Sequence, residues 1–274
     1  MTTARTSTVS AAPVPTPGRS SGRRYSQALW LLTVRDLRVR YSTSSLGYVW
    51  SILDPLLMSA IYWFVFTQVF HRGSVGEEPY IVFLLAALLP WTWFTGAVSD
   101  STRAFTKEAK LIRSTTIPRS IWVARIDLSK GIEFLLSIPV LAVFVLATGA
   151  HLHWQVVLWP IAIVLQAGLV YGIGLVIAPL VVFFRDLERA VKLVLRFLFY
   201  ASPVVYGTQA LPDSLRTIAG FNPLAGVFGI YRSAFFPAQL HWGEVASSAV
   251  VTLVVLGVGF LVFRRSEHRV LKEL

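Results

Sequence analysis

Three arginines, Arg35, Arg38 and Arg40, stand shortly before a long apolar stretch of the chain. A guanidinium donates charge-assisted hydrogen bonds to phosphate oxygens, and its long stem lets it reach an anionic headgroup layer from an apolar surface. A short joint, STSSLGY (residues 42–48), separates the arginines from the apolar stretch. That order of parts predicts a membrane interface, with the arginines at the headgroups and the chain then entering hydrocarbon.

The segment that carries the arginines, residues 23–49, is predicted to be an amphipathic helix lying on the membrane. Its apolar residues recur at intervals of four, three and four, which places them on one stripe of a helix: Trp30, Val34, Leu37 and Tyr41. Residues 1–22 are rich in Thr, Ser, Pro and Ala and lack the apolar core of a secretory signal. We expect them to form a disordered cytoplasmic tail.

Composition places most of the chain in a lipid bilayer. Hydrophobic residues make up 55% of the 274 residues and charged residues only 14%, whereas soluble domains carry about 25% charge. Apolar stretches near the ~20 residues that cross a bilayer predict six spans, at about 50–70, 80–98, 131–150, 156–184, 190–206 and 245–263. The expected fold is an all-α integral membrane protein with a transmembrane domain over 50–263 and a tail over 264–274.

Residues 207–243 are predicted to enter the membrane without crossing it. Their apolar pieces are too short to span about 30 Å at 1.5 Å per residue, and prolines and glycines interrupt them repeatedly. Irregular backbone at membrane depth must be buried in protein or line a cavity. We therefore expect a re-entrant pair of half-helices between the fifth and sixth spans.

Charge sets the expected orientation. Of the 25 Lys and Arg residues, 22 lie in four segments, at 1–49, 100–130, 185–196 and 264–274, that fall on the same side of a six-span topology. Because cytoplasmic loops carry the excess of Lys and Arg, both termini are predicted to be cytoplasmic, in a multi-pass protein of the inner or plasma membrane. The net charge of +11 is then explained by basic loops held at an anionic lipid surface, and we expect no nucleic acid partner.

Several chemistries are excluded by what the sequence lacks. There is no cysteine, which removes disulfides, thiol catalysis and zinc–thiolate sites. There is no Gly-Lys-Ser/Thr triplet, so no P-loop can hold ATP, and energy must come from another chain or an ion gradient. The pair His151 and His153 lacks further ligands, so no metal site or bound cofactor is expected and the chain is predicted not to be an enzyme.

Four stretches, in order, carry a family resemblance: RDLRVRYSTSSLGYVWSILDPLLM (35–58), AKLIRSTTIPRSIWVA (109–124), FFRDLERAVKLVLRFLFYASPVVY (183–206) and FNPLAGVFGIYRSAFF (221–236). Over about residues 25–274 the chain resembles the membrane subunit of ABC-2 type ATP-binding-cassette exporters, in the branch that exports O-antigen, teichoic acid and cell-wall galactan. The resemblance implies a homodimer of this chain, paired with two copies of a separate ATPase that holds ATP and Mg²⁺. It also implies a glycan on a polyprenyl diphosphate as substrate.

The resemblance gives the basic segments roles. Residues 103–119 become a coupling segment that docks on the ATPase, through Lys107, Glu108, Lys110, Leu111 and Arg113; the alternative is an ordinary basic cytoplasmic loop. Arg35, Arg38 and Arg40 become a diphosphate entrance; the alternative is anchoring to anionic lipid.

Other residues receive roles along the path and in the framework. The aromatic rings that could stack on sugars, or form the aromatic girdle of the membrane interface, are Tyr48, Trp50, Tyr62, Trp63, Trp91, Trp93, Tyr200, Tyr206 and Tyr231. The residues expected to be structural or gating are Gly47, Asp54, Pro55, Arg185, Asp186, Asn222, Pro223 and Arg232. Asp54 is placed to cap the first span, Glu133 to pair with Lys130 or reach water, and Arg232 to brace the half-helices or face the exit.

Three alternatives stay open. A secondary transporter would show clustered intramembrane carboxylates or histidines and an internal repeat. A membrane-embedded enzyme would show a compact acid/base constellation, whereas the acidic residues here are isolated or adjoin arginines. An ABC-2 exporter of a drug or small lipid would keep the fold and change the cargo. Arginine outnumbers lysine by 20 to 5, a bias typical of GC-rich genomes, and this favours cell-wall galactan of an actinobacterium.

Overall fold

The computed structural model describes residues 21–42, 77–115 and 117–273, together with residues 50, 53, 56–58, 60–61 and 64–65. The predicted first span and its joint fall largely outside these residues. The predicted site residues that lie outside them are Gly47, Tyr48, Asp54, Pro55, Tyr62 and Trp63.

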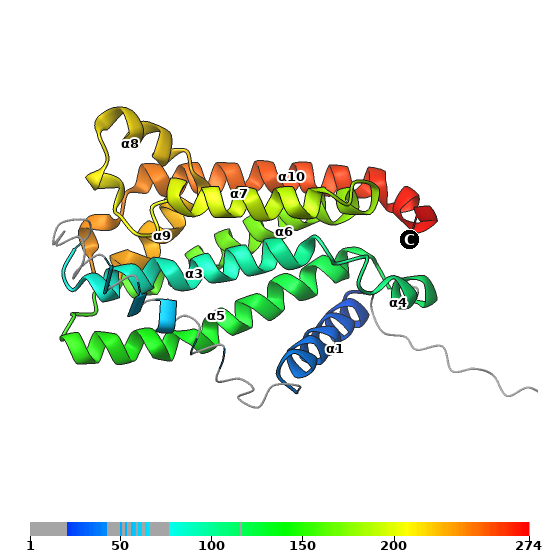
Figure 1. Cartoon of the computed structure of the whole chain (residues 1–274), viewed down its shortest axis with the longest axis horizontal. Helices are drawn as coiled ribbons and strands as arrows, with labels where there is room; N and C mark the ends of the chain where they lie inside the picture. Colours follow the sequence, from blue (N-terminus) through cyan, green and yellow to red (C-terminus); the bar gives the residue numbers. More distant parts are fainter. Residues whose placement is uncertain are drawn as a thin grey trace, which may run out of the picture.

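The described part of the chain contains helices and no strand, which confirms the all-α prediction (Figure 1). In order, the helices are α1 Ser21–Ser42, α3 Tyr80–Ser101, α4 Ala109–Ser114, α5 Ser120–Thr148, η2 Trp154–Leu158, α6 Trp159–Phe183, α7 Leu187–Ala201, η3 Thr208–Ala210, α8 Asp213–Gly220, α9 Pro223–Ser233, η4 Pro237–Gln239 and α10 Trp242–Glu273. The longer ones, α3, α5, α6, α7 and α10, run side by side as a bundle (Figure 1).

Four helical segments of the described chain are long and apolar enough to cross a membrane: Tyr80–Ser101, Ser120–Thr148, Trp154–Phe183 and Trp242–Glu267. They coincide with the predicted second, third, fourth and last spans. At the predicted fifth span, α7 has 15 residues and rises about 22 Å, short of a full bilayer core. A count of six spans therefore stays a prediction.

Helix α3 forms the centre of the bundle. In its most apolar window 83% of the residues are buried, against 22% in α5 and in α10, whose outer faces are open. On one side α6 and α10 approach closely, because a Cβ at Gly259 would lie 2.5 Å from the carbonyl oxygen of Gly172. Small residues that let two helix backbones meet are a common feature of membrane bundles.

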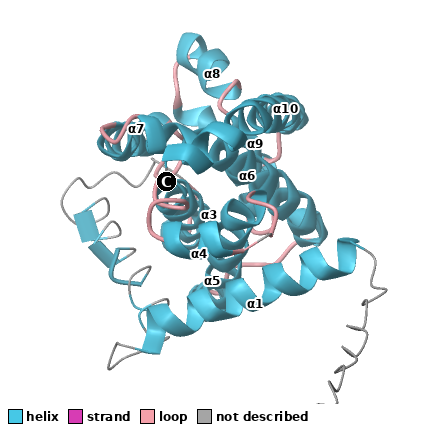
Figure 2. Ribbon diagram, turned by 90° about the vertical axis from the view of Figure 1, so that its right-hand side faces the viewer, coloured by secondary structure: helices cyan, strands magenta, loops and turns pink. Residues whose placement is uncertain are grey.

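Helix α1 lies across the bundle instead of along it (Figures 1 and 2). Tyr25, Leu29 and Leu32 pack against the buried core, mainly on α5. Trp30, on the predicted apolar stripe, is 57% exposed. The helix thus presents one face to the bundle and leaves a second apolar face open, as an interfacial helix requires.

Two basic segments that the sequence predicts to be non-spanning are more helical than expected. Helix α5 begins at Ser120, eleven residues before the predicted start of its span, because Ile121, Trp122 and Val123 are buried and continue its packed face. Likewise α10 continues to Glu273 through the predicted tail, where Val270 is buried. The non-spanning part of the predicted basic segment 100–130 therefore consists of the turns and the short helix α4 between the end of α3 and the start of α5.

The segment after α7 contains short helices, of which α8 has eight residues and α9 eleven; a re-entrant arrangement of the two stays a prediction. Asn222 caps α9, since its side-chain oxygen accepts from the Leu224 amide at 3.0 Å while its amide nitrogen donates to Ser202 Oγ at 2.9 Å. Pro223 occupies the first turn, where its missing N–H is not needed. Both residues therefore have a structural role at the start of α9.

Candidate functional site

Four charged side chains from three elements meet around Arg125, and we call Arg35, Asp36, Glu108 and Arg125 the Arg125 cluster. Arg125, on α5, is only 3% exposed and donates to both carboxylate oxygens of Asp36, at 2.5 and 2.6 Å. Arg35 donates to Glu108 at 2.8 Å, and Arg125 lies 3.7 Å from the same carboxylate. The cluster therefore joins α1 and the segment before α4 to α5.

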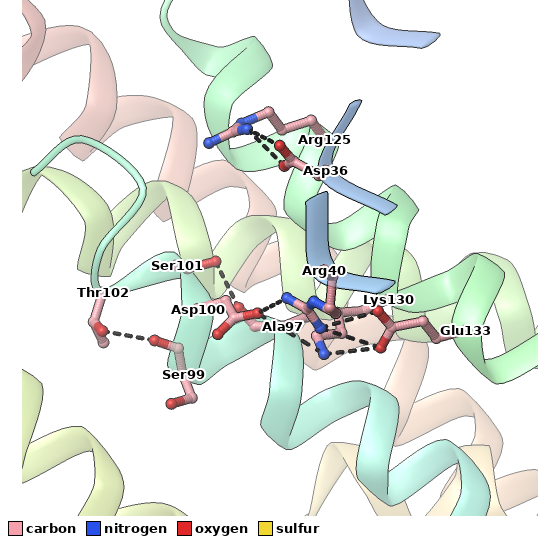
Figure 3. Close-up of polar contacts among 10 residues, drawn as sticks. All are labelled: Asp36, Arg40, Ala97, Ser99, Asp100, Ser101, Thr102, Arg125, Lys130 and Glu133. Carbon is pink, nitrogen blue, oxygen red and sulfur yellow. Dashed lines mark hydrogen bonds and ion pairs between the residues drawn. The ribbon is translucent and has the colours of Figure 1, made fainter. Parts of the chain in front are cut away.

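A second set, the Arg40 cluster, contains Arg40, Asp100, Lys130 and Glu133 (Figure 3). Arg40 donates to Asp100 at 2.7 Å and to Glu133 at 2.9 Å, so its guanidinium bridges α3 and α5. Lys130 donates to Glu133 at 2.8 Å, which confirms the predicted pairing. The end of α1 is thus attached to the bundle at two separate points.

A cavity of about 600 Å³ lies between the two clusters. It is lined by Arg35, Asp36, Val39, Arg40, Asp100, Arg103, Ala104, Lys107, Glu108, Arg125 and Ile126. Five of these side chains are cationic and three are anionic, so the cavity carries a net charge of +2. A polar cavity with excess positive charge, at the end of an apolar bundle, is suited to an anionic headgroup.

The predicted coupling residues divide by the direction in which they face. Lys107, Lys110 and Arg113 are exposed, whereas Leu111 packs against the core. Glu108 faces inward and belongs to the Arg125 cluster. One side of this short segment is fastened to the protein and the other presents positive charge to solvent.

A third ion pair links the end of α3 to α7. The Nε of Arg103 donates to Glu188 at 2.9 Å, and Lys192 Nζ donates to the same carboxylate at 2.7 Å. Hydrogen bonds from Arg103, then from Lys192, lower the pKa of Glu188 from 4.5 to about 2. Arg185 and Asp186 lie in the exposed turn just before this point.

The predicted aromatic rings are not gathered on one surface of the described chain. Trp91 packs against Phe199, while Tyr231 is 1% exposed. By contrast Tyr200 is 73% exposed. The remaining rings differ as well: Trp93 is buried, Tyr206 is half-buried and Trp50 is exposed. A sugar could stack on the buried rings only if their present contacts opened.

Arg232 is buried in the framework at the end of the bundle opposite α4. Its guanidinium donates to four backbone carbonyls and lies 3.7 Å from the centroid of the Phe83 ring. The acceptors are Phe83, Pro203, Val204 and Tyr206, at 2.6 to 3.1 Å. Of the two roles considered for Arg232, these contacts support bracing.

Sequence reasoning missed three residues of this region, Asp36, Arg125 and Asp127. Asp127 is 8% exposed and accepts a hydrogen bond from Trp93 Nε1 at 3.1 Å. Arg125 and Asp127 were hidden in a segment read as a basic loop, although the apolar residues around them have helical spacing. The partner of Asp36 is 89 residues away, and no local pattern predicts such a pair.

Comparisons with known proteins agree on one family. The family described as ABC-2 type transporter matches residues 27–236. The O-antigen export system permease protein RfbA of Klebsiella pneumoniae is 33% identical over 245 residues, 88% of this chain and 92% of that protein. RfbA of Myxococcus xanthus is 30% identical, over 89% and 95% of the two chains. The polysialic acid transport protein KpsM of Escherichia coli is 27% identical, over 88% and 93%.

Proposed function

The chain belongs to the ABC-2 type transporter family, and from that premise we propose that it is the membrane subunit of an ATP-driven exporter of lipid-linked polysaccharide. The glycan would be carried on a polyprenyl diphosphate and move from the cytoplasm across the membrane. Similar proteins named for O-antigen export and polysialic acid transport support a polysaccharide cargo. The observation that carries the proposal is the cavity of net charge +2 between α1, α3 and α5.

Coupling to the ATPase is argued from the two faces of the segment around α4. Its exposed cations, Lys107, Lys110 and Arg113, would contact the partner ATPase, and Lys107 also lines the cavity. Its inward carboxylate, Glu108, contacts Arg35 of α1 and lies beside Arg125 of α5. Closure of the ATPase would therefore move α1 and α5 together. ATP and Mg²⁺ belong to that partner, and this chain is the non-catalytic permease subunit.

The three entrance arginines would act differently toward a diphosphate. Arg35 and Arg40 line the cavity and already hold carboxylates, so an incoming diphosphate would compete with Asp36, Glu108, Asp100 and Glu133. Arg38 is exposed, and no ion pair joins it to another described residue. We assign the first contact to Arg38 and the subsequent contact to the cavity.

The arrangement in the membrane follows the family and the charge distribution. We infer six spans, a re-entrant segment formed by α8 and α9, and both termini in the cytoplasm. Support comes from α4, the start of α7 and the end of α10, which lie at the same end of the bundle (Figure 1). The complex would contain two copies of this chain and two of the ATPase, with cell-wall galactan as the favoured cargo.

The proposal is tested by reconstituting the chain with the ATPase encoded beside it, in proteoliposomes that contain lipid-linked galactan. ATP, added on the side of the ATPase, should drive the glycan to the opposite leaflet. A glycosidase placed on that opposite side should then digest it. Arg38→Gln with Arg40→Gln should reduce this transport, and Arg264→Gln with Arg265→Gln should not. If lipid-linked galactan neither stimulates ATP hydrolysis nor crosses the bilayer, the cargo proposal fails. Normal transport by the Arg38/Arg40 variant would show that these arginines anchor the helix to anionic lipid and do not bind the diphosphate.

One observation favours the alternative cargo of a drug or small lipid. An apolar cavity of about 570 Å³ lies between α1, α5, α6 and α10, with Asp127 among its lining residues. A small amphiphilic molecule would fit such a site. Hydrolysis stimulated by hydrophobic cations and not by lipid-linked glycan would favour this alternative. Membership of the ABC-2 family removes the secondary transporter from consideration.

A further inference from the structure

A row of cationic side chains begins in the turn before α7 and continues along that helix. Arg189, Lys192 and Arg196 follow one another at intervals of three and four residues, which places them on one narrow stripe of α7, and Arg185 lies four residues before Arg189, in the turn before the helix begins. All four side chains are exposed. We call this row the α7 ladder; from Arg189 to Arg196 it extends for about 10 Å along the helix axis.

The ladder is separate from the face by which α7 packs. Val191, Leu195 and Phe199 are the buried residues of the helix and hold it against the bundle. A third face, with Leu193 and Phe197, is apolar and exposed. The cations therefore lie between a packed face and an open apolar face, and they are not required for attaching α7 to its own chain.

Helix electrostatics do not explain the ladder either. The amino-terminal end of a helix has a partial positive charge, so cations there are unfavourable and anions are favourable. Arg185 and Arg189 add positive charge at this end of α7, and Glu188 is the acidic residue of its first turn. The surplus of cations weakens the helix and strengthens its attraction for an anion.

The position of Arg196 along the membrane normal indicates the environment of the α7 ladder. Arg196 ends the basic segment 185–196 that the charge count places on the cytoplasmic side, yet it also lies six residues inside the predicted fifth span, which begins at residue 190. A charged side chain at that depth is unfavourable in contact with lipid, and charged residues of membrane helices face a protein interior or a water-filled passage. With no carboxylate of the described chain paired to Arg196, an aqueous passage is the consistent environment.

The base of the ladder adjoins the cationic cavity. Arg103 lines that cavity and donates to Glu188, which also accepts from Lys192 of the ladder. Positive charge thus continues from the cavity, across the end of α3, to the side of α7. At the far end, Tyr200 follows Arg196 by four residues and is 73% exposed.

We propose that the α7 ladder is a phosphate-binding track, along which the diphosphate head of the lipid carrier passes from the cavity toward the middle of the membrane. This inference rests on the proposed function and names a second anion site of the same pathway. Arg189 and Arg196 would bind phosphate oxygens directly, while Lys192, held by Glu188, would position the first contact.

The test uses the assembled permease–ATPase complex in nanodiscs, with geranylgeranyl diphosphate as the probe. We expect Arg189→Gln with Arg196→Gln to raise the half-saturating concentration of the probe at least tenfold, with basal ATP hydrolysis within twofold of the parent. Arg189→Lys with Arg196→Lys, which keeps the charge, should recover most of the affinity. Arg264→Gln with Arg265→Gln removes equal charge from exposed positions of α10 and should leave binding unchanged.

Three further ligands separate the sources of the phosphate. Inorganic pyrophosphate should also bind less tightly to the Gln variant, because the head is the recognised part, and geranylgeraniol should bind equally to both. If only the dependence on phosphatidylglycerol in the nanodisc changes, the ladder anchors membrane lipid and the proposal is overturned. An unchanged affinity for the diphosphate, or an equal loss in the Arg264/Arg265 control, also overturns it.

The absence of cysteine from the chain permits a test that does not need the double variant to fold. Arg196→Cys should react with a charged, membrane-impermeant methanethiosulfonate at least tenfold faster than Leu253→Cys, which replaces an exposed apolar residue of α10. Geranylgeranyl diphosphate should slow that reaction. Equal, slow reaction at both positions would place Arg196 in lipid and overturn the proposal.

Failure of the proposed function would look different. If the complex binds geranylgeranyl diphosphate through the ladder but moves no glycan, the track stands and the cargo is wrong. If glycan is exported normally by the Arg189/Arg196 Gln variant, the exporter stands and the track is wrong.

Discussion

Two buried arginines, at opposite ends of the bundle, are held in opposite ways. Arg125 is 3% exposed and Arg232 is 2% exposed. The partners of Arg125 are the carboxylates of Asp36 and Glu108, and its buried Nε has no acceptor among the described residues. Arg232 instead donates from Nε and both terminal nitrogens to backbone carbonyls.

The difference concerns what can move. Backbone carbonyls are fixed by the helix or turn that carries them, so Arg232 fastens α9, the start of α3 and the turn after α7 into a single unit. Carboxylate side chains on α1 and beside α4 can exchange one cation for another, so the Arg125 cluster can rearrange without unfolding. We infer that the end near α4 is adjustable and the end near α9 is rigid.

The largest expected effect comes from removing Arg232. Arg232→Met would leave four carbonyls without this donor, three of them in buried contacts, and losses of about 3–5 kcal/mol are usual when a buried charged partner is removed. We expect a fall of roughly 10 °C in melting temperature, measured by size-exclusion chromatography after heating in detergent. Arg232→Lys should recover little, because an ammonium cannot reproduce the planar fork of donors.

Arg216→Met serves as the control for this prediction, since Arg216 is an exposed arginine at the same end of the bundle. A variant Arg232→Met that melted within two or three degrees of the parent would show that the framework around α9 does not depend on the guanidinium. The contrast between the two ends would then be lost.

A smaller and more local effect is expected at the Arg125 cluster. Asp36→Asn leaves Arg125 with one carboxylate at 3.7 Å, and the loss of a charged hydrogen bond is worth about 1.5–3 kcal/mol. We expect faster amide exchange in α1, by about tenfold or more, with little change in the melting of the bundle. Hydrogen exchange measured by mass spectrometry would detect this.

Asp186→Asn is the matched control, because Asp186 is an exposed aspartate in a turn. If Asp36→Asn unfolds the bundle as Arg232→Met does, the Arg125 cluster belongs to the rigid framework. If exchange in α1 does not change, other contacts hold α1 on α5.

The same two arginines show how far sequence reasoning reaches. The apolar runs predicted spans where the four long described helices lie, because burial in lipid needs only length and hydrophobicity. Arg232 was noted as an ionisable residue in an otherwise apolar segment, a pattern that is visible locally. Its acceptors could not be predicted, since they are backbone carbonyls brought near only by the fold.

Arg125 was missed for a related reason. Seven Lys and Arg residues between 100 and 130 indicate a basic loop, yet several of them pair with carboxylates of other helices: Arg125 with Asp36 of α1, Arg103 with Glu188 of α7 and Arg119 with Glu267 of α10. A count of charged residues gives composition and does not show which charges are paired. It therefore did not indicate that α5 begins at Ser120, within the basic segment. The entrance arginines were recognised by type, while the cavity that Arg35 and Arg40 share with three carboxylates required the structure.

The Arg40 cluster should be weaker than the Arg125 cluster, because its guanidinium side chain is 40% exposed. Ion pairs of this kind contribute about 0.2–1 kcal/mol and are screened by salt. We expect Arg40→Gln to accelerate amide exchange at the end of α1 only a few-fold, and less at 1 M than at 0.1 M NaCl. An effect as large as that of Asp36→Asn, and independent of salt, would contradict the ranking.

The smallest expected effect is that of pH on Glu188, which joins the end of α3 to α7. Because pairing lowers its pKa from 4.5 to about 2, the stabilisation is fully present above pH 4.5 and is lost as the pH falls toward 2. The pairs are open to solvent, so salt should reduce the effect. Amide exchange in the first turns of α7, corrected for its intrinsic dependence on pH, should accelerate over this interval in the parent and not in Glu188→Gln. Glu273→Gln, at an exposed position of α10, should behave as the parent; an identical pH response in Glu188→Gln would show that another group links α7 to the adjustable end.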